Sequence, residues 1–128
     1  MNSLARFTEE AYALLRIVSG LMFSFHGVQK IFGFLAQHPV EFGSQMWFGG
    51  ILELVGGIAI LVGFQTRVAA FLCSGMMAVA YVQFHWKFAG GDQFFPVINK
   101  GELAVLYCFA FLFIACRGPG KWSLDRTR

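Results

Sequence analysis

The sequence predicts an all-α integral membrane protein, a bundle of four transmembrane helices forming one domain over residues 1–128, with both termini in the cytoplasm. Of its 128 residues, 57% are hydrophobic and only 13% are charged, whereas about a quarter of an ordinary soluble domain is charged. The 16 phenylalanines add apolar surface that a soluble core of this size could not bury. Lipid solvates such surface, so the composition indicates a membrane protein.

Four apolar segments are the predicted transmembrane helices, since a span needs roughly 20 mostly apolar residues. They cover residues 11–31, 48–64, 68–88 and 102–116. The second and fourth are short, so we expect them to stand nearly upright or to begin in the interface. Backbone groups in lipid must be hydrogen-bonded within the segment, which favours helices, and no alternation typical of barrel strands is visible.

Glycine-containing turns bound each predicted span in order, because glycine interrupts helices. Gly33 follows the first span, and a tight turn that begins at Gly63 separates the second from the third. The pair Gly90-Gly91 ends the third span, and Gly118 follows the fourth. The apolar runs are therefore separate helices joined by short loops.

The basic residues predict the orientation, because cytoplasmic loops carry an excess of Lys and Arg. One side of the predicted bundle carries Arg6, Arg16, Arg67, Arg117, Lys121, Arg126 and Arg128. The other side carries Lys30, Lys87 and Lys100. We therefore expect a multi-pass protein of the inner (cytoplasmic) membrane with cytoplasmic termini. The basic tail would face anionic lipid headgroups, which accounts for the net charge of +3 without a nucleic-acid partner.

Two features of the cytoplasmic half have a structural interpretation. Arg16 lies near the cytoplasmic start of the first span, where we expect it to snorkel to headgroups or to pair with a polar group below. Small residues line the second span and recur at every fourth position of the third, at Ala70, Ser74 and Ala78. Such stripes are typical of helix-packing faces in membranes.

Polar and ionisable residues gather toward the outer ends of all four spans, where lipid makes them costly. They are His26, Gln29 and Lys30 on the first span, Glu53 on the second, Gln83, His85 and Lys87 on the third, and Asn99, Lys100 and Glu102 at the fourth. His26 and Glu53 are too deep to reach water easily. We therefore predict one shared polar pocket between the helices.

Several kinds of site fit such a pocket, and the residues alone leave them open. The first is a structural ion pair, for instance between Glu53 and Lys30, that fixes helix register. The second is a quinone-type site, in which a histidine and a carboxylate exchange two protons and phenylalanines surround the ring. The third, which we rank below the quinone, is a haem held by His26 and His85.

Neither a metal ion nor a dithiol is predicted. His26 and His85 with two glutamates, Glu53 and Glu102, are chemically able to bind a metal, but their spacing matches no recognisable signature. The three cysteines lie apart in apolar runs, at Cys73, Cys108 and Cys116. Without a C-x-x-C pair, electrons would have to come from a partner or a bound cofactor.

Beyond these patterns, the sequence resembles the DoxX family over nearly its whole length. The resemblance rests on RIVSG (16–20), FHGVQK (25–30), ELVGG (53–57), Gly63, TR (66–67), His85, NKGE (99–102), GPG (118–120) and SLD (123–125). Lys100 departs from the pattern, since the family more often has glycine there. The resemblance implies a small four-helix inner-membrane protein, labelled as an oxidoreductase or a subunit of redox complexes linked to sulfur compounds, quinones or oxidative stress. Related proteins have assembly or chaperone roles, so fold is implied more firmly than activity.

Pocket and resemblance together lead us to expect a membrane oxidoreductase or redox-complex subunit with an outward-facing site for a quinone-type or other small redox ligand. His26 and Glu53 are the predicted catalytic residues. The predicted ligand-binding residues are Gln29, Lys30, His85, Asn99 and Glu102. The alternative is a non-enzymatic accessory or chaperone subunit that docks another membrane protein through its small-residue faces. Expected partners are membrane lipid and a membrane or peripheral redox protein, and self-association stays open.

Overall fold

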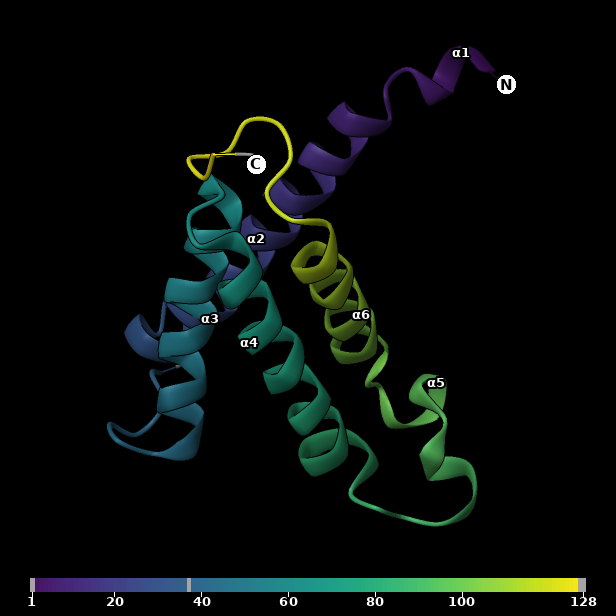
Figure 1. Ribbon diagram of the computed structural model, residues 1–128. Helices are drawn as coiled ribbons and strands as arrows, with labels where there is room; N and C mark the ends of the chain where they lie inside the picture. The colour runs from purple at the N-terminus through teal and green to yellow at the C-terminus, as the bar shows by residue number, and fades with distance from the viewer. Residues whose placement is uncertain (1, 37, 127–128) are drawn as a thin grey trace.

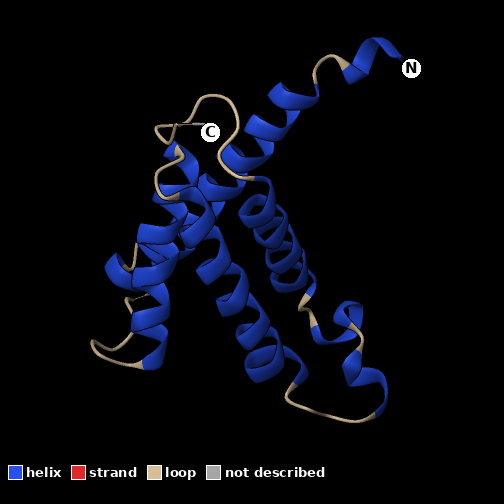
Figure 2. Ribbon diagram, viewed as in Figure 1, coloured by secondary structure: helices blue, strands red, loops and turns tan. Residues whose placement is uncertain are grey.

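Helices are the regular secondary structure in the residues that the structure, a computed structural model, describes, which are 2–36 and 38–126. Figure 2 shows helices and loops and no strand among these residues. The elements are α1 (Asn2–Ala5), α2 (Thr8–Phe32), α3 (Gln45–Val62), α4 (Thr66–Ala80), the π-helix η1 (Tyr81–Trp86), the 3-10 helix η2 (Gly91–Phe94), α5 (Pro96–Asn99) and α6 (Glu102–Arg117). Arg128, one of the residues that predict the orientation, lies outside the described residues.

Three stretches of helix are long and apolar enough to cross a membrane, namely α2, α3 and the continuous stretch formed by α4 and η1. The fourth, α6, has 16 residues and so a length of about 24 Å, shorter than the roughly 30 Å of a hydrocarbon core. The predicted all-α membrane bundle is confirmed, with α6 as its short member. The cytoplasmic orientation of the termini stays a prediction, and Figure 1 shows both termini at the same end of the bundle.

The helix boundaries differ from the predicted spans for local reasons. The second span was predicted over 48–64, but α3 begins at Gln45 because the side chain of Ser44 caps it, accepting a hydrogen bond from the backbone N–H of Trp47 at 3.2 Å. It ends at Val62 because Gly63 adopts a left-handed conformation, with φ of 72°. The third span ends at Trp86 rather than at residue 88, since Lys87 is also left-handed, with φ of 57°.

Two antiparallel helix pairs make up the bundle. Helix α2 packs along α3, and α4 packs along α6, while the contact between α3 and α4 is less extensive. Glycines let the first pair approach closely: a Cβ added to Gly57 would lie 2.6 Å from the backbone nitrogen of Ser24 on α2. In the second pair, the hydroxyl of Ser74 donates to the carbonyl oxygen of Cys108 at 2.7 Å. Small residues therefore mark packing faces, as predicted.

At the end that holds the termini, Arg16 fastens the C-terminal tail to the bundle. Its side chain is fully buried, and it donates to four carbonyl oxygens at 2.8 Å each: those of Ile60, Leu61, Lys121 and Trp122. The first two are among the last carbonyls of α3, which lack partners within the helix. Of the two alternatives expected for Arg16, pairing with polar groups of the protein is the one observed, because four carbonyls inside the protein accept from its guanidinium.

Asp125 completes the fastening of the tail by capping the start of α4. Its carboxylate accepts from the backbone N–H groups of Gln65 and Thr66, at 2.9 and 2.8 Å, and from the Thr66 hydroxyl at 2.7 Å. Burial raises the pKa of Asp125, but the hydrogen bonds from Thr66 and Gln65 outweigh it, so that the pKa is lowered overall. Figure 1 shows the tail lying across this end.

Two basic residues near the end of the chain are paired within the protein, and one of them, Lys121, belongs to the tail that was expected to face lipid headgroups. Arg117 pairs with Glu9, and the Lys121 ammonium lies 2.5 Å from a carboxylate oxygen of Glu10. Both partners lie in the first turn of α2. These contacts join the beginning of α2 to the last residue of α6 and to the C-terminal tail.

Candidate functional site

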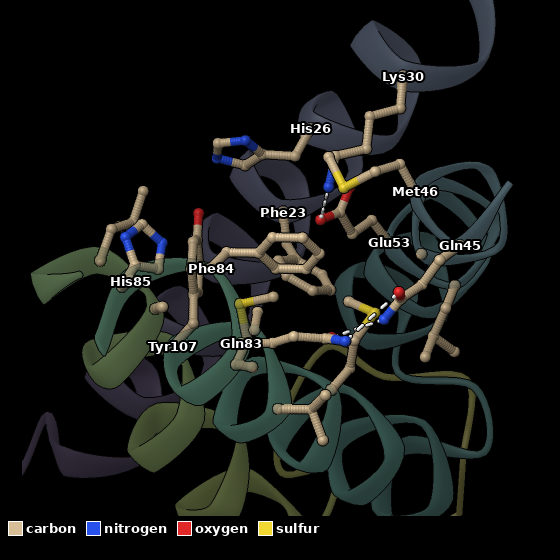
Figure 3. Close-up of a pocket in the computed structure, with 18 of the residues that line it drawn as sticks. Phe23, His26, Lys30, Gln45, Met46, Glu53, Gln83, Phe84, His85 and Tyr107 are labelled. Atoms are coloured by element: carbon tan, nitrogen blue, oxygen red, sulfur yellow. Dashed lines mark hydrogen bonds and ion pairs between the residues drawn. The ribbon is translucent and has the colours of Figure 1, made fainter. Parts of the chain in front are cut away.

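A cavity of about 560 Å³ lies at the opposite end of the bundle, between the two helix pairs. Its volume falls within the range of small-molecule sites. Residues of α2, α3, α4, η1 and α6 line it, with Lys100 just before α6 (Figure 3). Aromatic and aliphatic side chains form most of the wall, among them Phe23, Phe48, Leu52, Met77, Phe84 and Leu103. The space is therefore large enough for a small molecule with a mostly apolar body.

An ion pair joins two helices at the cavity. Lys30 on α2 and Glu53 on α3 meet with 2.6 Å between the Lys30 Nζ and the Glu53 Oε1 (Figure 3). The Glu53 side chain is 5% exposed and that of Lys30 is 25% exposed. The contact that the sequence suggested between these two residues is thus present. Gly50, one turn before Glu53, leaves the space that the Lys30 stem occupies, since an added Cβ there would lie 2.9 Å from its Cβ.

Two polar atoms of cavity-lining residues are buried without a hydrogen-bond partner in the described part of the chain. They are the second carboxylate oxygen of Glu53, Oε2, and the hydroxyl oxygen of Tyr107. Burying a polar atom without a partner costs about 1–3 kcal/mol, and more when it is charged. Each unsatisfied atom of this kind needs a physical explanation, and both belong to residues that line a ligand-sized cavity.

Tyr107 is held in place by the rings around it. Phe23 and Phe111 lie 5.1 and 5.3 Å from it, and His26 meets it edge-to-face at 6.2 Å, all between ring centroids. His26 lies one helical turn before Lys30, so both face the cavity from α2. Figure 3 shows the Tyr107 hydroxyl pointing toward the side of the cavity where the two histidines lie.

The π-helix η1 brings the third helical stretch into the site. It places Gln83, Phe84 and His85 at the cavity, and π-helical turns are frequent at functional sites because they change which side chains face inward. The His85 ring stacks on that of Tyr81, with 6.4 Å between centroids, and its Nδ1 lies 3.4 Å from the Asn99 carbonyl oxygen. These contacts hold His85 at the cavity edge.

Two glutamines bridge the helix pairs beside the cavity. The Gln45 amide on α3 donates to the Gln83 side-chain oxygen at 2.6 Å, and Gln83 donates back at 3.5 Å (Figure 3). The bridge closes one side of the space between α3 and η1.

The structure brings together four of the seven predicted site residues, namely His26, Lys30, Glu53 and His85. The other three lie outside the cavity lining. The Gln29 amide donates to the Leu35 carbonyl oxygen at 3.4 Å, and Glu102 is exposed in the first turn of α6. Asn99 has a supporting role, since its amide donates to the Tyr81 hydroxyl at 3.0 Å and its side-chain oxygen accepts from the Gly101 N–H at 2.9 Å.

Tyr107 and Gln45 are cavity residues that the sequence analysis did not select. The signal for Tyr107 was present, because it carries the one hydroxyl in the apolar run 103–116. Gln45 lies just ahead of the predicted second span and gave no comparable signal. Lys100, which belongs to the polar residues at the outer ends of the spans but not to the seven predicted site residues, also lines the cavity.

The positions of the histidine, cysteine and acidic residues give different results for a metal ion and for a haem. Within 2–36 and 38–126, no group of three or more His, Cys, Asp or Glu side chains lies close enough to hold a metal ion. His26 and His85 do line one cavity from different helices, so axial ligation by two histidines stays a prediction. The cysteines Cys73, Cys108 and Cys116 are all free in the described residues.

Comparison with known proteins gives consistent relatives. The DoxX family model matches residues 11–86. An uncharacterized protein of Haemophilus influenzae is 39% identical over 98% of this chain and 96% of its own length. The inner membrane protein YqjF of Escherichia coli is 36% identical over 59% of this chain and 55% of its own length. The inner membrane protein YphA of Escherichia coli is 30% identical over 88% of this chain and 86% of its own length. No solved structure matches.

Proposed function

This chain belongs to the DoxX family and is a multi-pass protein of the inner membrane, and on that premise we propose that its cavity binds a quinone-type ring. In this proposal the protein is an oxidoreductase or the quinone-binding subunit of a redox complex. Quinones partition into the bilayer, and the cavity lies between helices of the bundle, where such a ligand is concentrated. The apolar walls suit the ring, and the few polar groups suit its oxygens.

The observation that carries the proposal is the state of Glu53. A buried charge is costly unless it is fully hydrogen-bonded. Glu10, which pairs with Lys121, also has a buried carboxylate oxygen without a partner among the described residues, but Glu53 is the carboxylate that lines the ligand-sized cavity. Lys30 satisfies Oε1 at 2.6 Å, whereas Oε2 is buried without a partner among the described residues. The ion pair therefore orients a carboxylate that has an acceptor left for a ligand.

The proposed chemistry assigns protons to side chains and electrons to a partner. Oxidation of a quinol to a quinone releases two protons and two electrons. Glu53 accepts one proton at Oε2 and His26 accepts the other, while Lys30 stabilises a singly deprotonated, anionic ring. The described cysteines form no dithiol, so both electrons pass to a membrane or peripheral redox protein.

An absorbance spectrum of the purified protein is the first test, because it separates the quinone from the haem alternative. We expect no Soret band. A Soret band lost in both His26→Ala and His85→Ala would contradict the quinone proposal and favour a haem held by the two histidines.

Binding of a defined probe is the second test. The probe is a benzoquinone with a single isoprenoid unit, titrated in both redox states against the protein in lipid nanodiscs. His26→Ala and Glu53→Leu are expected to weaken binding at least tenfold, since each removes a polar contact. His38→Ala and Glu41→Leu are matched controls, because both side chains are exposed in the loop between α2 and α3.

If the folded wild-type protein binds neither redox state of the probe, the proposal fails. Stoichiometric co-purification with a membrane protein would then favour the accessory role. The surface that this alternative relied on is largely used within the bundle, since Gly50, Gly57 and Ser74 pack against α2 or α6.

A further inference from the structure

Two residues that line the cavity carry buried, unpartnered polar atoms whose hydrogen-bonding capacity differs. Oε2 of Glu53 belongs to a carboxylate paired with an ammonium, so it accepts hydrogen bonds and does not donate them. The hydroxyl of Tyr107 both donates and accepts. Neither atom has a partner in the part of the chain that the structure describes.

The two atoms belong to different walls of the cavity. Glu53 comes from α3, where Lys30 of α2 fixes its carboxylate, and Tyr107 comes from α6, where Phe23, Phe111 and His26 fix its ring. Figure 3 shows Glu53 beside Lys30 and Tyr107 on the side of the histidines, with Phe23 between them in this view. A ligand that satisfies both atoms therefore needs polar groups at two separate positions on an apolar body.

Resting on the proposed function, we infer that the cavity selects the reduced, hydroxyl-bearing form of the ring, with Glu53 accepting a hydrogen bond from one hydroxyl and Tyr107 bonding the other oxygen. A quinol has a hydroxyl at each end of the ring, so it supplies the donor that Oε2 requires. A quinone has only carbonyl acceptors, and one of them would face the carboxylate oxygen with no proton between them. That contact is repulsive and leaves Oε2 buried and unsatisfied.

The other polar groups at the cavity do not reverse this preference. Lys30, Lys100 and His26 line the cavity. Each lysine can donate to an oxygen of either redox form, and a neutral His26 has one donor and one acceptor nitrogen, so it can bond to either form as well. Their contribution is similar for the quinol and the quinone. The acceptor-only carboxylate of Glu53 is the group that distinguishes the two forms, and Tyr107 strengthens the binding of both.

The test compares the dissociation constants of the two redox forms of the single-isoprenoid probe under argon, with the full chain in lipid nanodiscs. For the wild type, the hydroquinone is expected to bind at least tenfold more tightly than the quinone, and a tenfold difference corresponds to about 1.4 kcal/mol. In Glu53→Gln, the amide can donate to a carbonyl, so the ratio is expected to fall to one or to reverse. Tyr107→Phe weakens both forms by a similar factor and leaves the ratio unchanged.

Two controls and a second readout make the outcomes separable. Glu41→Gln and Tyr12→Phe, which lie away from the cavity, are expected to leave the ratio and the affinities unchanged. A redox titration of the probe bound to wild-type protein needs no variant: tighter binding of the reduced form raises the midpoint potential by about 30 mV per tenfold difference in affinity.

Equal affinities, or tighter binding of the quinone with a lowered midpoint potential, overturn the inference and leave the proposed function standing. If neither form binds to folded protein, the proposed function itself fails. An unchanged ratio in a folded Glu53→Gln variant also overturns the inference, because the discrimination would then come from another group.

Discussion

Replacing Arg16 with leucine should destabilise the bundle strongly, because its guanidinium joins α3 to the C-terminal tail. Leucine keeps an apolar side chain in the buried site but removes the donors to four carbonyl oxygens. The carbonyls of Lys121 and Trp122 lie in exposed residues, so they regain water once the tail lifts. Those of Ile60 and Leu61 lie in the last turn of α3. The Leu61 carbonyl loses its partner, and the Ile60 carbonyl keeps only the hydrogen bond from the Gly63 N–H at 3.2 Å.

The expected loss follows from these two α3 carbonyls. A hydrogen bond to a charged group contributes about 1.5–3 kcal/mol, so two of them give about 3–6 kcal/mol. That is a large part of the roughly 5–15 kcal/mol that stabilises an ordinary folded protein. Arg16→Lys should lose about half as much, since one ammonium nitrogen cannot serve both groups of carbonyls in the way that the forked guanidinium does.

The assay is unfolding in mixed micelles with increasing dodecyl sulfate, followed by circular dichroism. Arg6→Leu is the matched control, because Arg6 is exposed before α2, and its effect should stay within about 0.5 kcal/mol. Trypsin cleavage after Lys121 reports release of the tail and should become faster in Arg16→Leu. A loss below about 1 kcal/mol with the tail still protected would refute the assigned role of Arg16.

Three further predictions concern helix packing, the tail and the ion pair. Gly57→Ala should lower the free energy of unfolding by about 1–3 kcal/mol, because its Cβ would meet the α2 backbone. Gly75→Ala is the control: an added Cβ there has nothing within 4 Å, so this variant should be neutral or more stable by about 0.5–1 kcal/mol. Similar unfolding curves for the two variants would argue against close packing of α2 on α3. Asp125 has a lowered pKa in the folded protein, so the wild type should be more stable than Asp125→Ala. This difference in stability should be complete at pH values above 3.8, the ordinary pKa of the group, and should be lost as the pH falls through the lowered pKa. A difference in stability that does not change with pH would contradict the capping role. Lys30→Met should cost about 3 kcal/mol, at the low end for a buried pair since Lys30 is partly exposed. Adding Glu53→Leu should restore much of that stability without restoring binding of the quinone probe, and a double variant that still binds would show the pair to be structural.

The apolar runs predicted the bundle because a single span in lipid must form its backbone hydrogen bonds within itself, which a helix does. The ends of α3 were harder to predict, since they depend on Ser44 and Gly63 as local caps. The role of Arg16 could not be deduced locally. Two of its acceptors, in Lys121 and Trp122, lie more than 100 residues away along the chain.

The sequence predicted the depth of the site residues in the membrane better than the direction in which their side chains point around the helix axes. Counting residues from the span ends placed His26, Lys30, Glu53 and His85 at one level, and all four line the cavity. Depth does not say which way a side chain points around the helix axis, which is why Glu102 was selected with them although it is exposed. A π-helical turn such as η1 changes that rotation in a way that hydrophobic periodicity does not reveal.

Tyr107 shows a different limit of the sequence analysis. The residues predicted to be costly in lipid had charged, imidazole or amide side chains, and Tyr107 was not among them. Its burial without a hydrogen-bond partner among the described residues emerges only when the four helices are assembled.

Photoaffinity labelling locates the ligand within the bundle and so tests the proposed quinone-type site between the helix pairs. An azidoquinone is irradiated with the protein in native membranes, and the adducts are mapped by mass spectrometry. A ligand in the cavity should give adducts on peptides that contain residues 45–53 and 76–85, suppressed by excess unlabelled probe and reduced in Glu53→Leu. Adducts confined to lipid-facing residues of α6 such as Phe109 and Phe113, both exposed on the bundle, and insensitive to competitor would contradict it.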